Sequence, residues 1–114
     1  MIAATYNMLA DQGATFGRVI TWNTSAGTPV NLTGYTAKMQ VRTTDSTRTL
    51  VLELSTINGR IALGGAAGTI TLTVAAADMG ATAGVHVYDL ELTVGTTVTR
   101  LTQGQFDIRP EVTV

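Results

Sequence analysis

The chain has 114 residues, a net charge of −1 and no cysteine. This length supports one domain with one hydrophobic core, and the lack of cysteine excludes disulfide bonds and thiolate metal sites. Lysines and arginines are scattered along the chain and the pI is near 5.6. These features argue against nucleic-acid binding, which needs a basic patch.

No apolar run reaches the roughly 18 residues that a membrane-spanning helix needs. Residues 1–7 lack the basic start and the long apolar stretch of a secretory signal. We therefore expect no membrane partner and a protein that is made and assembled in cytoplasm.

Charged residues form only 13% of the chain, although hydrophobic residues form 45%. A typical soluble domain has about 25% charged residues, and an under-charged surface promotes association. The composition therefore indicates permanent protein neighbours. The alternative is a small monomer whose surface is covered by threonine hydroxyls.

Threonine is the commonest residue, and its branched Cβ favours strands. Alternation of apolar and polar residues is clearest at 35–42, which is typical of a half-buried antiparallel strand. Pro110 should end regular pairing, and Gly104 should mark a bulge. The predicted extended segments are residues 14–22, 30–34, 35–42, 50–54, 60–63, 69–74, 85–94 (the longest), 97–103 and 105–109.

Turn signals separate these segments. Residues 23–29 and 64–68 read as loops, and Asn58 with Gly59 predicts a tight turn. Residues 75–79 can form one helical turn, too short to be stable alone. Residues 1–12 show no clear period, so we expect an N-terminal arm that docks on a neighbour or a frayed terminus.

About eight short strands at these intervals are typical of sandwiches and barrels, and no strand alternates with a long helix, which disfavours a parallel α/β sheet. We predict an all-β fold, an antiparallel β-sandwich that is Ig-like or jelly-roll-like, with one short helical turn. The predicted organisation is an N-terminal arm at residues 1–12 and a single sandwich domain at residues 13–114. The strand order does not follow from the pattern.

Catalytic and metal chemistry would depend on one histidine. His86 lies in the middle of a predicted strand on an apolar face, where a buried, hydrogen-bonded histidine is the expected state. A metal site needs several convergent ligands. None of Ser25, Ser46 and Ser55 lies in a Gly-x-Ser-x-Gly elbow. We predict no enzyme activity and no catalytic, cofactor-binding or metal-binding residues.

Carboxylate pairs could perform acid–base chemistry. Asp89 and Glu91 point to the same side of a strand, roughly 7 Å apart by strand rise, but that side is polar, so a solvated or interface role is expected. Asp107 and Glu111 are separated by Pro110 and show no pairing signal.

Other local motifs have structural interpretations. The glycine-rich residues 64–68 are followed by no Lys-Ser or Lys-Thr, so a hairpin loop is favoured over phosphate binding. Asn23 and Asn31 begin glycosylation sequons, but a cytoplasmic product does not meet that machinery. Trp22 and Tyr88 are assigned to the core, with sugar stacking as the alternative.

Several stretches resemble small structural proteins of tailed bacteriophages. The clearest runs from Asn31-Leu32-Thr33-Gly34-Tyr35 through an alternating strand to Val41-Arg42. The chain is also similar, more loosely, to the N-terminal domain of phage baseplate upper proteins. The likeness covers roughly residues 13–113 and includes residues 57–61, 87–92, 104–106 and 110–113.

The resemblance implies a β-sandwich component of the virion, assembled in the host cytoplasm, that docks on a tail, baseplate or capsid. Its implied partners are other virion proteins and copies of itself, with no nucleic acid, membrane, cofactor or small-molecule substrate. No coiled coil or fibre region follows Thr113-Val114, so we expect an adaptor, a tail or baseplate accessory, or a capsid decoration protein. Residues 1–12, 23–29 and 109–114 are the expected contact elements. The alternative is a carbohydrate- or cell-surface-binding β-sandwich module.

Overall fold

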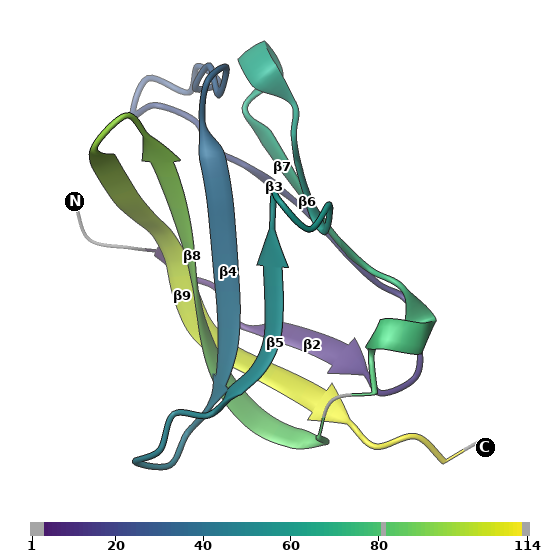
Figure 1. The fold of residues 1–114 in the computed structure, drawn as a ribbon. Helices are drawn as coiled ribbons and strands as arrows, with labels where there is room; N and C mark the ends of the chain where they lie inside the picture. The colour runs from purple at the N-terminus through teal and green to yellow at the C-terminus, as the bar shows by residue number, and fades with distance from the viewer. Residues whose placement is uncertain (1–3, 81, 113–114) are drawn as a thin grey trace.

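A computed structural model describes residues 4–80 and 82–112, which form nine strands in two sheets (Figure 1). Two short 3-10 helices, η1 and η2, connect β6 to β7 and β7 to β8, respectively. The elements are β1 (Ala4–Thr5), β2 (Met8–Asp11), β3 (Phe16–Thr21), β4 (Thr36–Thr43), β5 (Leu50–Ser55), β6 (Ile61–Leu63), η1 (Gly65–Ala67), β7 (Thr69–Val74), η2 (Ala76–Asp78), β8 (Gly84–Val94) and β9 (Thr97–Arg109).

The strand order is that of an immunoglobulin-type sandwich. The larger sheet has six strands in the order β1-β9-β8-β4-β5, with β2 also paired to β9, and the smaller sheet has the order β3-β7-β6. Taken in chain order, these sheets correspond to the G-F-C-C′ and B-E-D arrangements of that fold. The predicted all-β sandwich is confirmed, and the Ig-like form is the one that fits.

The core lies between the two sheets and is built from alternate residues of each strand. Phe106 of β9 is fully buried near its centre, with its ring 5.2 Å from that of Phe16 and 6.4 Å from that of Tyr88. Phe16 comes from the smaller sheet and Tyr88 from the larger one, so this aromatic group ties the two layers together. Ile108, two residues further along β9, is also buried.

The N-terminal residues belong to the sandwich. We expected residues 1–12 to be an arm on a neighbour or a frayed end, but β1 and β2 both pair with β9 of the same chain. Met8 and Ala10 are buried there. The pairing is parallel, so the larger sheet is not wholly antiparallel. The strands β1 and β2 are too short to show a clear two-residue period, and their partner strand lies at the other end of the chain. The sequence therefore did not indicate this pairing. Residues 1–3 lie outside the described residues.

The C-terminal hairpin also differs from expectation. Residues 97–109 form one unbroken strand of 13 residues, longer than β8 with 11. The predicted bulge at Gly104 is wrong: the register shifts where Leu90 pairs with Thr102 and Glu91 with Arg100, so the extra residue is Leu101. Residues 30–34 are not a regular strand, since they make only isolated bonds such as that from the Leu32 N–H to the Gly65 carbonyl.

Gly104 is needed for close approach of the N-terminal strands. A Cβ built on it would lie 2.6 Å from Asn7 Oδ1 and 2.8 Å from the Tyr6 carbonyl oxygen. The Asn7 amide oxygen accepts a bond from the Gln105 N–H at 3.0 Å, and the Tyr6 N–H donates to the Gln103 carbonyl. The absence of a side chain at Gly104 therefore lets the link between β1 and β2 lie against β9.

We predict that Gly104→Ala lowers the free energy of unfolding by about 1–3 kcal/mol, because the new methyl group forces the backbone at Tyr6 away from β9. Urea unfolding followed by fluorescence measures this loss. Gly17→Ala is the matched control in another strand, since its nearest contact would be an ordinary 3.9 Å. Equal stability of the two variants would contradict the assignment.

Candidate docking surfaces

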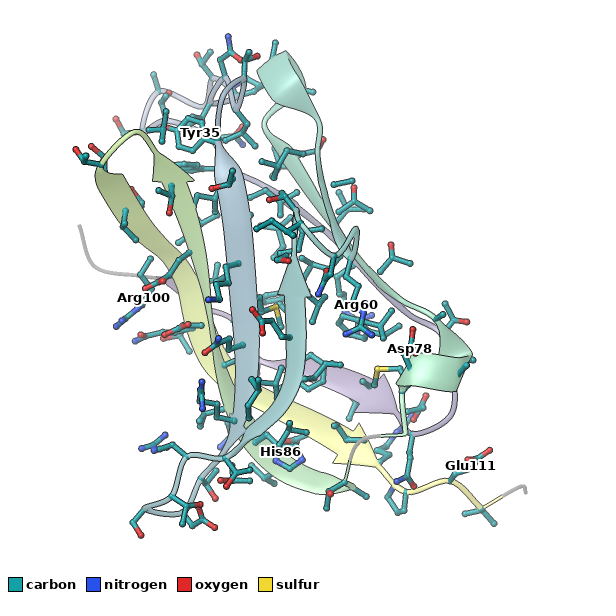
Figure 2. All side chains as sticks on the ribbon, viewed as in Figure 1. Tyr35, Arg60, Asp78, His86, Arg100 and Glu111 are labelled. Carbon is teal, nitrogen blue, oxygen red and sulfur yellow. The ribbon has the colours of Figure 1, made fainter. Side chains whose placement is uncertain are left out.

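His86 has a structural position near the start of β8, beside the corner that precedes this strand (Figure 2). The residue is 5% exposed, and Nε2 lies 2.7 Å from the Thr82 carbonyl oxygen. Because a carbonyl only accepts, Nε2 carries the proton. Immunoglobulin-type domains use a tyrosine hydroxyl for the same backbone contact at this corner. His86 Nδ1 has no partner among the described residues. The prediction of a buried histidine is confirmed, with one ring nitrogen bonded.

The predicted acidic residues contribute to surface ion pairs. Arg100 of β9 lies between Asp89 and Glu91, at 3.4 Å from Asp89 Oδ2 and 3.8 Å from Glu91 Oε2. These carboxylates are thus on the polar face, as expected. Asp107 and Glu111 are not brought together as a pair: Asp107 Oδ1 has no partner among the described residues, and the Glu111 N–H donates to Gln12. In the described part of the chain, no group of three or more His, Cys, Asp or Glu residues could hold a metal ion.

A polar groove of about 620 Å³ lies on the outer face of the larger sheet. It forms where adjacent strands place amide and charged side chains in register, with Gln40 opposite Asp89 and Asp89 opposite Gln103. Its lining offers hydrogen-bond donors and acceptors but no nucleophile–base pair. The lining residues are Thr5, Asn7, Gln40, Arg42, Arg48, Val87, Tyr88, Asp89, Gln103, Gly104 and Gln105.

Arg42 organises one end of this groove. Its guanidinium donates to Gln40 Oε1 at 2.8 and 3.1 Å and to the Arg48 carbonyl at 2.8 Å. Arg48 adopts a φ of +48°, which is uncommon for a residue with a side chain. The Arg42 contact helps to hold this backbone conformation, and so the loop between β4 and β5 is anchored to the sheet.

Trp22 and Tyr88 are engaged in the core and do not form an exposed platform. Trp22 packs against the core with its ring 5.9 Å from that of Tyr35, edge to face. Tyr88 is 4% exposed and donates its hydroxyl to the Tyr6 carbonyl. Burial raises the pKa of the Tyr88 phenol. Among the described residues lining the groove, Tyr88 alone is aromatic. The assignment of Trp22 and Tyr88 to the core is confirmed.

The glycine-rich segment 64–68 lies close to the backbone of Trp22. Gly68 has a φ of +70°, and a Cβ on it would lie 2.8 Å from the Trp22 carbonyl oxygen. The Trp22 N–H donates to the Gly68 carbonyl. The segment contains η1 and joins β6 to β7, as the hairpin interpretation predicted.

The free edge of β5 is covered by the turn that follows it. The Glu53 carbonyl accepts from Asn58 Nδ2 at 3.0 Å and from Arg60 Nη1 at 2.9 Å. The Ser55 N–H donates to Asn58 Oδ1, and Ser55 Oγ accepts from the Asn58 N–H. Arg60 also contacts Asp78 at 3.4 Å (Figure 2). Edge strands protected in this way resist pairing with other chains.

The edges of β2 and β3 share one capping residue. Arg18 donates from Nη2 to the Leu9 carbonyl and from Nη1 to the Gly17 carbonyl, each at 2.8 Å. Its guanidinium lies 5.0 Å from the centre of the Phe16 ring. The start of the β3 edge is therefore partly covered and adjoins β2.

The outer face of the smaller sheet has no charged residue at its described outward positions on the three strands. Val19 of β3, Thr71 of β7 and Ala62 of β6 form its central row. Val19 is 64% exposed. A face of this kind is suited to protein contact, because docking on it removes no charge from water. Its outward residues are Gly17, Val19, Thr21, Ala62, Thr69, Thr71 and Thr73.

The predicted contact elements have different positions. Residues 23–29 are exposed and closed by a bridge between Asn23 and Pro29, so this loop is accessible to a partner. The start of the tail is bound within the chain, since Arg109 Nε donates to Asp11 Oδ1 at 2.6 Å. Ile57, 95% exposed in the turn after β5, was not singled out from the sequence. Residues 113–114 lie outside the described part.

Over residues 4–80 and 82–112, no helix has the length and apolar character needed to cross a membrane.

No protein-family model and no curated protein matches this chain. Among solved structures, it is similar to the extracellular domain of the voltage-gated sodium channel beta4 subunit, with a TM-score of 0.47 and 9% identity over 98% of this chain and 97% of the other. It is also similar to Tim-1, with a TM-score of 0.40 and 13% identity over 99% of both chains. The fold assignment made above depends on the strand order alone.

We predict that His86→Leu lowers the free energy of unfolding by about 1–3 kcal/mol, because the Thr82 carbonyl loses its donor. His86→Gln keeps a side-chain N–H and should lose less. Thermal unfolding of the two variants measures the difference. Identical losses would show that the contact to Thr82 does not stabilise the corner.

The ion pair between Asp11 and Arg109 should make the attachment of β2 sensitive to acid. The hydrogen bond from Arg109 holds the pKa of Asp11 below its usual 3.8. The stabilisation is therefore present above about pH 4 and is lost as pH falls through the lowered pKa. We expect Asp11→Asn to remove this part of the acid dependence of Tm between pH 2 and about pH 6. Arg109→Gln should remove the same part, and the double variant should remove no more. An additive double variant would contradict the pairing.

Proposed function

We propose that this chain is a non-enzymatic structural module of a tailed-bacteriophage virion. In this proposal it acts as a tail, baseplate or adaptor accessory or as a capsid decoration protein, and its partners are other virion proteins and copies of itself. The sequence resemblance to small phage structural proteins motivates the virion assignment. The low proportion of charged residues and the Ig-like sandwich support a role in protein contact.

One observation carries the docking part of the proposal, namely the uncharged outer face of the β3-β7-β6 sheet. It presents threonine, valine, alanine and glycine on three adjacent strands. Polar side chains that could suggest chemistry are bonded to the backbone instead. His86 bonds to the Thr82 carbonyl, and Arg60 bonds to the Glu53 carbonyl. Docking therefore accounts for the exposed surface better than catalysis does.

The polar groove favours a second candidate, a carbohydrate- or cell-surface-binding module. Gln103 and Gln105 are exposed on its floor and could hydrogen-bond sugar hydroxyls. This candidate also needs exposed aromatic rings for stacking. Trp22 packs against the core and Tyr88 is buried, so its main support from the sequence is removed.

We expect the chain to be a stoichiometric component of purified phage particles. Quantitative mass spectrometry against the major capsid protein measures its copy number, and antibody labelling in negative-stain images locates it. Thr71→Lys places a charge at the centre of the uncharged face and should lower occupancy roughly tenfold or more, since a tenfold loss corresponds to about 1.4 kcal/mol of docking energy. Thr97→Lys, an exposed threonine on β9, is the matched control and should leave occupancy unchanged.

If the chain is absent from purified particles, the virion proposal is wrong. Equal occupancy of the two variants would show that the chain docks through another surface. Binding of the free chain to cells or to immobilised glycans, weakened by Gln103→Ala, would support the second candidate instead.

A further inference from the structure

The strand β3 has an open edge between Val19 and Thr21. In β7, the Thr73 N–H donates to the Arg60 carbonyl and the Thr69 carbonyl accepts from the Gly64 N–H, so alternate residues of β7 face β6. The other residues of β7 therefore bond to Phe16, Arg18 and Ile20 of β3. It follows that the N–H and carbonyl groups of Gly17, Val19 and Thr21 point away from the sheet.

This edge lacks most of the side-chain capping found on the edges of β5 and β2. On β5 the side chains of Asn58 and Arg60 bond the outward groups, and on β2 Arg18 bonds the Leu9 carbonyl. On β3 only the Gly17 carbonyl has such a donor. An unprotected edge is a template for strand addition.

Exposed apolar side chains also lie on and next to these edge strands. Arg18 joins the edges of β2 and β3, so these two edges are adjacent. Val19 on β3 is 64% exposed and Leu9 on β2 is 43% exposed. Tyr6, in the link before β2, is 39% exposed.

We propose that a second copy of this chain adds to the open edge, with β3 pairing antiparallel to β3 of the second copy around a two-fold axis. Val19 lies opposite Val19 of the second copy, and Gly17 lies opposite Thr21. The two three-stranded sheets become one continuous six-stranded sheet. The inference rests on the proposed docking function and names copies of the chain as one partner.

Charge and pairing select this register. A register that sets Gly17 opposite Val19 would place Arg18 opposite Arg18 of the second copy, and like charges directly opposite are unfavourable. A register that sets Val19 opposite Thr21 forms one fewer hydrogen-bonded pair of outward residues. In the chosen register Arg18 lies opposite Ile20. The Gly17 carbonyl can accept a second donor, since the oxygen has two lone pairs.

The test uses the full chain in sedimentation velocity over protein concentrations up to about 100 μM, where a Kd of that order is measurable. We expect a dimer. Val19→Lys and Val19→Glu each place like charges together on the two-fold axis and should raise the Kd roughly tenfold or more. Mixing these two variants should restore a heterodimer, because opposite charges then meet. Val98→Lys, which replaces a valine 57% exposed on β9, is the matched control and should dimerise normally.

A second variant tests the backbone contact directly. Val19→Pro removes an outward N–H without removing a bond to β7, and proline is tolerated on the open side of an edge strand. It should prevent dimerisation while far-UV circular dichroism stays unchanged; if that variant fails to fold, the charge pair decides. A monomeric wild-type chain, or a dimer unaffected by Val19→Lys and Val19→Glu, would overturn the inference. A chain that is monomeric in solution but stoichiometric in particles would overturn this inference alone, whereas a dimer absent from particles would overturn only the virion proposal.

Discussion

The pairing of β9 is the interaction on which the rest of the structure depends. This strand of 13 residues is antiparallel to β8 along its length and parallel to β1 and β2 on its other side. It also places Phe106 between the rings of Phe16 and Tyr88, and so links the two layers of the core. Both ends of the described chain are held by this one strand (Figure 1).

This use of the N-terminal residues has a consequence for the smaller sheet. Because residues 4–11 pair with β9, no segment of the described chain lies on the outer side of β3. Arg18 covers the place where β2 and β3 meet, but its guanidinium reaches only the first outward carbonyl of β3. Side chains of the same chain therefore cap the edge of β5, whereas most of the edge of β3 stays uncapped.

Polar side chains in this protein mostly stabilise backbone geometry. Arg42 holds the Arg48 carbonyl, Arg60 holds the Glu53 carbonyl and His86 holds the Thr82 carbonyl. Each of these contacts fixes a loop or a corner to a sheet. The larger sheet presents a polar outer face with surface ion pairs, whereas the outer face of the smaller sheet is uncharged.

The all-β class and most strands could be predicted from the sequence, because the alternation at residues such as 36–43 and 69–74 is a local property of the chain. The sequence also indicated that His86, Tyr88 and Trp22 belong to structure, since each is on an apolar face. Only the tertiary structure decided the strand order, the parallel pairing of β2, the capping roles of Arg18 and Arg60, and hence which edge remains open. These features depend on contacts between residues distant in sequence, such as Met8 with Phe106, and side-chain periodicity contains no information about which distant strand becomes the neighbour.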